Sequence, residues 1–324
     1  MLLQVFILLL SLTFLVISAD KFVYGASSIA RNFGISPMII GLTIVAMGTS
    51  APEMMAAASA SLQGKPNAGI GNAIGSNITN ITLVLGFTAL CKPLIVSSSI
   101  IKKEFPLLLA ICGLTYWMFF NNHFSLWEGL ILLTIFICFI LYLIISTLKQ
   151  SQDKQASDKL LSEAERELPP ATSNIKALIW LLMGIIVLPI SANYLVAAAA
   201  NIAKTFGISD LVIGLTIIAV GTSLPELAAS LVSIYKKEDD LAIGNIIGSN
   251  LFNLLAVLAL PGIIAPGQVD PALETRDIPF MIAVTLLLFV ICFSRQFGYF
   301  RITRLKGAVL LGCFFVYQYL IFSS

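Results

Sequence analysis

Two short motifs, GTSAPE and GTSLPE, each place a glutamate inside a long apolar stretch of the chain. These glutamates are Glu53 and Glu226. A charged carboxylate at the centre of a bilayer costs about 2.5 to 3.5 kcal/mol on insertion scales, so it is expected to face a cavity or a partner. Nearly all other acidic residues stand in loops or at the ends of apolar runs, and the exception, Asp20, has Lys21 beside it. The two glutamates are therefore the first candidates for chemistry.

Oxygen-bearing side chains accompany each glutamate at helical spacing. A threonine four residues before the glutamate shares its helix face, and a serine three residues before it lies on a neighbouring edge. These residues are Thr49 and Ser50 in the first motif and Thr222 and Ser223 in the second. The proline before each glutamate lacks an amide hydrogen and clashes with the preceding turn, which frees backbone carbonyl oxygens there. Carboxylate, hydroxyl and carbonyl oxygens are the ligands that hard cations such as Ca²⁺ prefer.

A second pair of motifs, GNAIGSN and GNIIGSN, follows in the next apolar run of each half. Each supplies two polar side chains four residues apart, Ser76 with Asn80 and Ser249 with Asn253. The glycines of these motifs permit close helix approach. Helix packing alone uses the same small and hydroxylated residues, but it does not explain two buried glutamates without a basic neighbour in sequence. We therefore predict that four broken or closely packed helices meet around one oxygen-lined site near the bilayer midplane.

Composition identifies the setting of this site as a membrane. Of the 324 residues, 58% are hydrophobic and 11% are charged, and the mean hydropathy is +0.96, well outside the range of soluble domains. The formal net charge of +2 gives no indication of a nucleic-acid partner, and the five scattered cysteines are interpreted as packing residues. A membrane-crossing helix needs about 20 apolar residues. Such runs predict ten transmembrane helices, at roughly 2–30, 37–62, 68–90, 104–121, 126–148, 175–204, 210–235, 241–264, 277–294 and 304–322.

The chain is an internal duplication. Residues 33–53 align with residues 206–226, with fifteen of the 21 positions identical, and the same offset of 173 residues aligns the GSN motifs and the stretches that begin at Ser18 and Ser191. The first apolar run therefore belongs to a repeat and is not expected to be a cleaved signal peptide. We expect a first five-helix repeat at 1–148, a polar linker at 149–174 and a second five-helix repeat at 175–324. The linker is expected to be a solvated connector, with a short surface helix as the alternative.

Five spans in each half require that the two homologous halves cross the bilayer in opposite senses. With the N-terminus outside, fifteen of the nineteen basic residues fall on the cytoplasmic side, as the positive-inside rule demands. The predicted fold class is thus an all-α membrane protein of ten transmembrane helices arranged as two inverted-topology five-helix repeats, the architecture of many secondary transporters. Both termini are then outside, and the linker is cytoplasmic.

The paired GTS-x-PE motifs, each followed by GNAIGSNITN or GNIIGSNLFN, resemble the two alpha-repeats of the cation/calcium exchanger superfamily and are close to those of prokaryotic sodium/calcium exchangers. The resemblance covers nearly the whole chain. It implies an antiporter of the bacterial inner (plasma) membrane, in which the first and sixth helices slide across a central cluster that binds Ca²⁺ and Na⁺ alternately. It also implies the ligands of that cluster: Thr49, Ser50, Glu53, Ser76, Asn80, Thr222, Ser223, Glu226, Ser249 and Asn253, with the backbone carbonyls of Ala46 and Ala219 for sodium.

One departure from the family pattern leaves the coupling ion open. Some members carry an aspartate at one of the positions of Asn80 and Asn253, whereas this chain has asparagine at both. Two carboxylates neutralise one Ca²⁺ but not several Na⁺ ions. Proton/calcium exchange and potassium-dependent exchange are therefore alternatives, because a buried glutamate can also bind a proton. A cation channel is disfavoured, since two different helix pairs at a single midplane site suit alternating access better.

Neither an enzyme nor a bound cofactor is expected from this sequence. The only histidine, His123, stands in the NNHF loop, and the chain has no HExxH motif. The expected partners are the transported Ca²⁺ and Na⁺ and the lipid bilayer, with no nucleic acid and no obligatory protein partner. The resemblance also implies constitutive or ion-gated operation, because the short linker leaves no room for the large regulatory domains of some animal exchangers.

Overall fold

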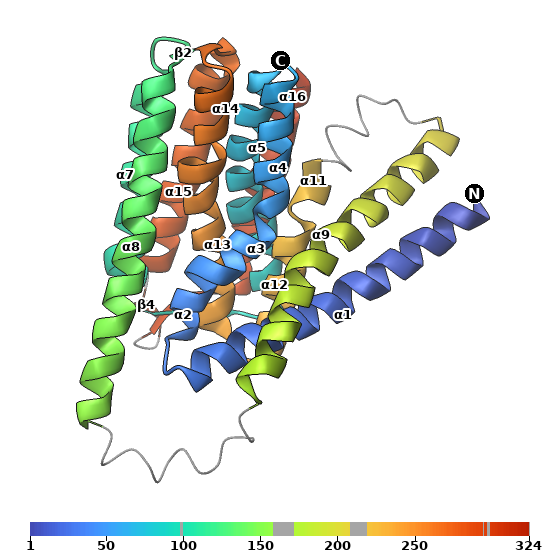
Figure 1. Ribbon diagram of the computed structural model, residues 1–324. Helices are drawn as coiled ribbons and strands as arrows, with labels where there is room; N and C mark the ends of the chain where they lie inside the picture. The colour runs from blue at the N-terminus through green and yellow to red at the C-terminus, as the bar shows by residue number, and fades with distance from the viewer. Residues whose placement is uncertain (98–99, 158–171, 208–218, 294, 297–298, 324) are drawn as a thin grey trace.

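Apolar helices make up nearly all of the molecule (Figure 1). The computed structural model describes residues 1–97, 100–157, 172–207, 219–293, 295–296 and 299–323. The pair Pro37–Thr49 and Ala51–Leu62, bent by 43°, is one candidate membrane span. Seven single helices among the described residues are also long and apolar enough to cross a bilayer: Leu2–Asn32, Pro66–Cys91, Leu126–Ile145, Asn174–Thr205, Asp239–Ile264, Leu273–Cys292 and Arg304–Ser323. The prediction of a helical membrane protein is therefore confirmed.

The duplication extends to the secondary structure, because elements of the two halves begin and end at residues 173 apart. The matching pairs are α3 (Ala46–Thr49) with α11 (Ala219–Thr222), α4 (Ala51–Leu62) with α12 (Leu224–Tyr235), α5 (Pro66–Thr79) with α13 (Asp239–Phe252), and α6 (Gly86–Cys91) with α14 (Ala259–Ile264). Two pairs of π-helical turns match as well: η3 (Ile100–Glu104) matches η7 (Leu273–Asp277) at both ends, and η2 (Asn80–Leu85) and η6 (Asn253–Val257) begin 173 residues apart. The counterpart of α2 (Pro37–Ile40) and η1 (Gly41–Val45) falls in residues 208–218, outside the described part of the chain.

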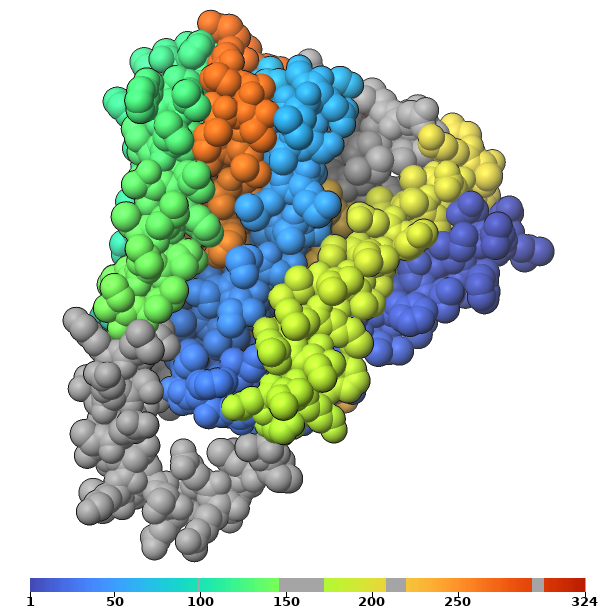
Figure 2. All heavy atoms as spheres, viewed as in Figure 1, coloured from blue at the N-terminus to red at the C-terminus, as the bar shows by residue number. Residues whose placement is uncertain are grey.

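Two long helices, α1 (Leu2–Asn32) and α9 (Asn174–Thr205), lie side by side and run obliquely to the other helices (Figure 1). Glycines let their backbones approach, because a Cβ built on Gly25 would lie 2.7 Å from the carbonyl oxygen of Ala177, and one built on Gly184 would lie 2.4 Å from the Cβ of Phe22. Figure 2 shows the two helices packed against each other along one flank of the molecule. Because of this close contact, α1 and α9 are expected to move together.

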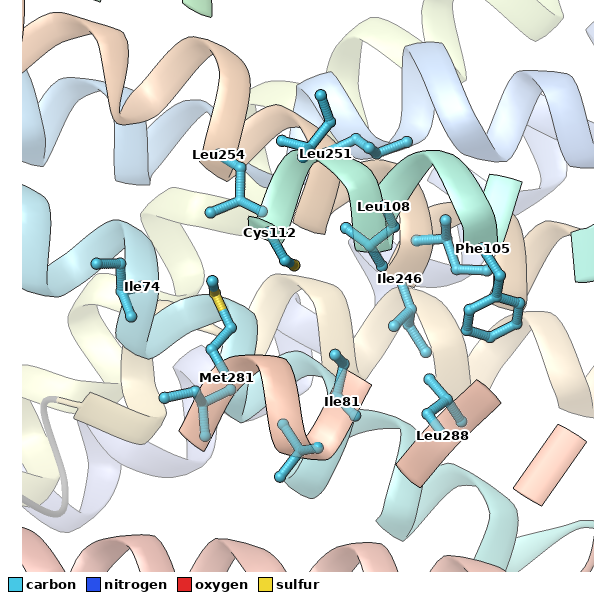
Figure 3. Packing of buried hydrophobic residues seen from close by; sticks show 14 of the residues in the cluster. Ile74, Ile81, Phe105, Leu108, Cys112, Ile246, Leu251, Leu254, Met281 and Leu288 are labelled. Carbon is cyan, nitrogen blue, oxygen red and sulfur yellow. The ribbon is translucent and has the colours of Figure 1, made fainter. Parts of the chain in front are cut away.

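The other helices form a bundle around the two helices that carry the GSN motifs. In the most apolar window of Asp239–Ile264, 89% of the residues are buried, and in that of Pro66–Cys91 72% are, against 22% in Leu2–Asn32. The GSN helices are therefore central, and their polar residues are shielded from lipid. Figure 3 shows the apolar cluster that surrounds them, which includes side chains of α7 (Phe105–Phe119) and α15 (Ile278–Phe293).

Short strands join loops at the two ends of the bundle. The strands β1 (Leu94–Val96), β5 (Tyr299–Ile302) and β4 (Arg295–Gln296) form an antiparallel sheet near the end where α8 (Leu126–Ser157) runs toward α9. At the opposite end, β2 (His123–Phe124) pairs with β3 (Gly267–Gln268). We call these the linker end and the β2 end. The fold is completed by α16 (Arg304–Ser323).

Two details of the chain differ from, or add to, the prediction. The helix α8 continues to Ser157, so residues 149–157 of the expected linker are helical. The stretch KQSQDKQAS contains neither glycine nor proline, and therefore nothing in it stops a helix that has already formed. The rest of the expected linker, residues 158–171, lies outside the described ranges. His123, expected in a loop between spans, stands in β2 opposite Gln268 and is half-buried.

Candidate cation-binding site

Breaks in two helices position the glutamates. Ser50, with φ −88° and ψ 3°, separates α3 from α4, and Ser223, with φ −93° and ψ 8°, separates α11 from α12. A proline follows within the first turn of each new helix, where its missing amide hydrogen removes no helical bond. Glu53 and Glu226 stand in the same first turns. Unpaired amides and the helix dipole favour a negative charge at that position.

Both carboxylates are buried, and they come from different repeats. Glu53 is 1% exposed and Glu226 is 0% exposed. The hydroxyl of Ser50 donates a hydrogen bond of 3.3 Å to Oε1 of Glu226, which links the two repeats. Within the described residues, neither glutamate forms an ion pair, and Oε2 of each has no hydrogen-bond partner. Because burying carboxylates without a counter-charge is costly, this arrangement favours a bound cation.

Thr49 connects the first broken helix to α13. Its buried hydroxyl oxygen lies 3.1 Å from Oδ1 of Asn245 and 3.3 Å from the hydroxyl oxygen of Ser249. The same atom lies 3.3 Å from the backbone carbonyl oxygen of Ala46. The hydroxyl of Thr49, itself expected at the site, thus lies beside two other expected oxygens, those of Ser249 and Ala46.

Glycines produce the close approach that these contacts require. A Cβ built on Gly244 would lie 2.6 Å from the carbonyl oxygen of Met38, and one built on Gly248 would lie 2.7 Å from the Cβ of Ala46. The expected role of these two glycines in close packing is confirmed. Around their repeat counterparts, Gly71 and Gly75, no described atom lies within 4 Å of such a Cβ. The helix that symmetry would place there falls in residues 208–218, outside the described ranges.

The asparagines of the GSN helices bring amide oxygens to the same buried layer. Nδ2 of Asn80 donates a hydrogen bond of 3.2 Å to Oδ1 of Asn250, and Oδ1 of Asn80 has no partner among the described residues. Asn253 is also buried, and in the described part of the chain neither of its side-chain polar atoms is hydrogen-bonded. Ser76 is buried on α5. Buried amide oxygens without a protein partner are available as cation ligands.

Only the last part of the second broken helix lies within the described residues. Its helix α11 begins at Ala219 and ends at Thr222, which is half-buried. Ser223 is buried, and its hydroxyl has no hydrogen-bond partner in the described residues. The sequence-predicted ligands of this half therefore lie at the expected break, but the preceding turns fall outside the described part.

Three asparagines that the sequence argument did not select lie in the same polar layer. Asn245 contacts Thr49, Asn250 contacts Asn80, and Nδ2 of Asn77 donates to the backbone carbonyl oxygen of Asn250 at 3.2 Å. Asn77 and Asn250 occupy the same position in the two GSN motifs, so equivalent asparagines meet where the repeats join. The signal was present in the sequence, because an amide repeated inside two apolar runs must find a partner when buried.

The ligands assembled here are two carboxylates among neutral oxygens. The described residues contain no group of three or more His, Cys, Asp or Glu side chains that could hold a metal ion. Hard cations such as Ca²⁺ accept carboxylate, carbonyl and hydroxyl oxygens, whereas transition metals prefer nitrogen and sulfur ligands. The fold and the site together define a membrane protein of two repeats with a buried acidic centre suited to hard cations.

Comparison with known proteins identifies the family. The chain belongs to the sodium/calcium exchanger protein family, whose pattern matches residues 3–145 and 176–323. The Alkalimonas amylolytica protein named "Putative antiporter CaxA" is 52% identical over 325 residues, which cover 100% of both chains. The "Sodium/calcium exchanger MaX1" of Methanosarcina acetivorans is 32% identical over 334 residues, which cover 94% of each chain. The solved structure of the sodium-calcium exchanger NCX_Mj, soaked with zero Na⁺ and Ca²⁺, matches with a TM-score of 0.81 and 31% identity over 97% of each chain. The family inferred from the motifs is therefore confirmed.

Proposed function

We propose that this protein is a secondary antiporter that exchanges Ca²⁺ for Na⁺ by alternating access. The observation that carries the proposal is the pair Glu53 and Glu226, which are buried together from two repeats, with no ion pair to either among the described residues. A divalent cation neutralises two carboxylates, and the desolvation of Ca²⁺ needs strong oxygen donors of this kind. Membership of the sodium/calcium exchanger protein family supports the same two ions.

The proposed ligands come from two GTS-x-PE helices and two GN-x-x-GSN-x-x-N helices. Glu53 and Glu226 hold Ca²⁺ in the centre, and hydroxyl, amide and carbonyl oxygens around them divide into smaller sites for Na⁺. The full proposed set is Thr49, Ser50, Glu53, Ser76, Asn80, Thr222, Ser223, Glu226, Ser249 and Asn253, with the carbonyls of Ala46 and Ala219. The contacts of Thr49 with Ser249 and of Ser50 with Glu226 support it, because they bring hydroxyls of one repeat to the ligands of the other.

The proposed architecture has ten spans in two inverted repeats, residues 1–148 and 175–324, joined by a cytoplasmic linker at 149–174. The equal offset between elements of the two halves supports the repeat. The ion pair of Lys92 with Asp239 and the pairing of β1 with β5 join loops that the positive-inside rule assigns to one side of the membrane. Both termini are outside in this arrangement, and the protein resides in the inner (plasma) membrane of a bacterium.

The experiment is uptake of radiolabelled Ca²⁺ into proteoliposomes that contain the purified protein. Vesicles are loaded with Na⁺, with K⁺, or with a pH gradient, and protein-free vesicles are the control. We expect an outward Na⁺ gradient to drive Ca²⁺ uptake, with a rate that depends on membrane potential if three or more Na⁺ exchange for one Ca²⁺. Equal uptake driven by a pH gradient without Na⁺ would contradict sodium coupling and favour proton/calcium exchange, and a K⁺ requirement would favour the potassium-dependent form.

A further inference from the structure

Ion pairs connect α1 to the helix bundle at the linker end. Asp20 pairs at 2.7 Å with Lys236, the residue that follows α12, and the same ammonium group donates a hydrogen bond of 3.1 Å to the backbone carbonyl oxygen of Asp20. It also lies 5.3 Å from the ring centroid of Tyr24. Farther along α1, Arg31 pairs with Glu238 at 2.6 Å. Three residues of one long helix thus converge on the short segment between α12 and α13.

The same contacts reach α9. Lys21 lies 3.3 Å from the carboxylate of Asp20 and 5.4 Å from the ring centroid of Trp180 on α9. At the end of α1, the side-chain amide of Asn32 donates to Oδ1 of Asn174 at 2.6 Å. Because Gly25 of α1 lies against the backbone of α9 and Gly184 of α9 lies against the side chain of Phe22 on α1, a force that holds α1 at the linker end also holds α9 there.

The second repeat does not carry these charges at the equivalent positions. Asn193 and Gln63 stand where Asp20 and Lys236 stand at the linker end. Lys204 and Lys65 stand where Arg31 and Glu238 stand. The first equivalent pair is neutral, and the second consists of two lysines, which cannot form an ion pair with each other. The duplication therefore places opposite charges at the linker end and places neutral or like-charged residues at the β2 end.

We propose that the ion pairs Asp20–Lys236 and Arg31–Glu238 form an asymmetric latch, which favours the conformation with α1 and α9 closed against the linker end. The inference rests on the alternating access proposed above, in which the repeats exchange roles between two conformations. Without the latch, repeats this similar would give the two conformations similar free energies. An exposed ion pair that forms in only one of two conformations shifts the equilibrium between them by about two- to fivefold. We expect a shift of that size from each ion pair of the latch.

The first pair of the latch borders an apolar groove. Asp20 and Lys21 lie at the end of a groove of about 580 Å³ between α1 and α12. The lining of the groove is otherwise apolar or aromatic, with Leu12, Val16 and Leu227 among its residues. Water screens a charge less on an apolar wall than in open solvent. The side chains of Asp20 and Lys236 are nevertheless 42% and 24% exposed, so this pair is expected to act within the same two- to fivefold range as Arg31–Glu238.

Distances between spin labels at both ends of the molecule test the latch. In a background without the five native cysteines, labels on Phe33 and Tyr235 report the linker end, and labels on the repeat-equivalent Phe206 and Leu62 report the β2 end. All four side chains are exposed. Asp20→Asn installs the residue that the other repeat has, and Lys236→Gln does the same for its partner. We expect either variant to shift the populations about two- to fivefold toward a longer linker-end distance and a shorter β2-end distance.

Two double variants provide the matched controls. Asp20→Lys with Lys236→Asp reverses the pair and should restore the parent distances. Asn193→Asp with Gln63→Lys builds the same pair at the β2 end and should shift the populations in the opposite direction. Distances that are unchanged in both Asp20→Asn and Lys236→Gln would overturn the latch and leave the proposed function intact. Absence of Na⁺-driven Ca²⁺ uptake by the parent protein would instead overturn the proposed function, whatever the labels report.

Discussion

Gly248 is the position where one added methyl group should disturb the candidate site most directly. In Gly248→Ala, the new Cβ would lie 2.7 Å from the Cβ of Ala46, 2.7 Å from the carbonyl oxygen of Leu42 and 2.8 Å from the Cα of Leu42. These neighbours are backbone atoms or a Cβ, so no side-chain rotation can relieve the contact. The helix α13 must therefore move away from η1 and α3.

The size of the effect follows from these distances. Carbon atoms in ordinary contact lie about 3.5 to 4.0 Å apart, so the two helices must separate by about 1 Å. The contacts of Thr49 with Asn245 and Ser249, now 3.1 and 3.3 Å, would then exceed hydrogen-bond distance. Overpacking of this kind costs about 1 to 3 kcal/mol. If about 1.4 kcal/mol of that cost falls on the ion-bound state, Ca²⁺ affinity decreases tenfold.

The assay combines thermal unfolding of the purified protein, with and without Ca²⁺, and Ca²⁺ uptake at graded concentrations. We expect Gly248→Ala to unfold at a lower temperature and to need about tenfold more Ca²⁺ for half-maximal uptake. The control is Gly113→Ala on α7, an exposed position where no described atom lies within 4 Å of the new Cβ. Unchanged stability and unchanged affinity in Gly248→Ala would refute the argument that tight contact between α13 and the first broken helix positions the ligands.

Three further predictions concern the charges of the site and one strained residue. Glu53→Gln and Glu226→Gln should each abolish Na⁺-driven Ca²⁺ uptake in a folded, inserted protein, because each removes half of the formal charge of the site; normal uptake by either variant would remove that residue from the site. Asn253→Asp should strengthen cation binding or allow protons to inhibit exchange more strongly at mildly acidic pH. If its calcium affinity, sodium dependence and pH profile all match the parent, the side chain does not face the ions. Lys237 has φ 63°, whereas its repeat counterpart is Gly64 with φ 72°; Lys237→Gly should therefore raise the unfolding free energy by up to about 1 kcal/mol, and a melting temperature that does not rise would argue against strain there.

Local signals in the sequence were sufficient to predict the helices and their breaks. Hydropathy depends on the residues of one segment, so the spans around α1, α9 and the GSN helices follow from composition alone. The helix breaks at Ser50 and Ser223 follow from the proline two residues later, because its ring clashes with the preceding helical turn. The continuation of α8 past residue 148 was not the expected form of this segment, since polar residues with good helix propensity leave the choice between helix and solvated connector weakly specified.

The sequence by itself determined that two glutamates, equivalent by duplication, stand in apolar stretches with oxygen-bearing side chains three and four residues before them. It could not determine which residues of one repeat meet which residues of the other. Ser50 reaches Glu226 and Thr49 reaches Asn245 only because glycines let α13 approach the first broken helix, and such contacts depend on packing between distant segments. Similarly, the sequence shows only Lys21 as a basic neighbour of Asp20, whereas the fold also brings Lys236 into an ion pair with it. Spacing along a helix is set by local geometry, but the partner of a side chain across a helix interface is decided by the tertiary structure.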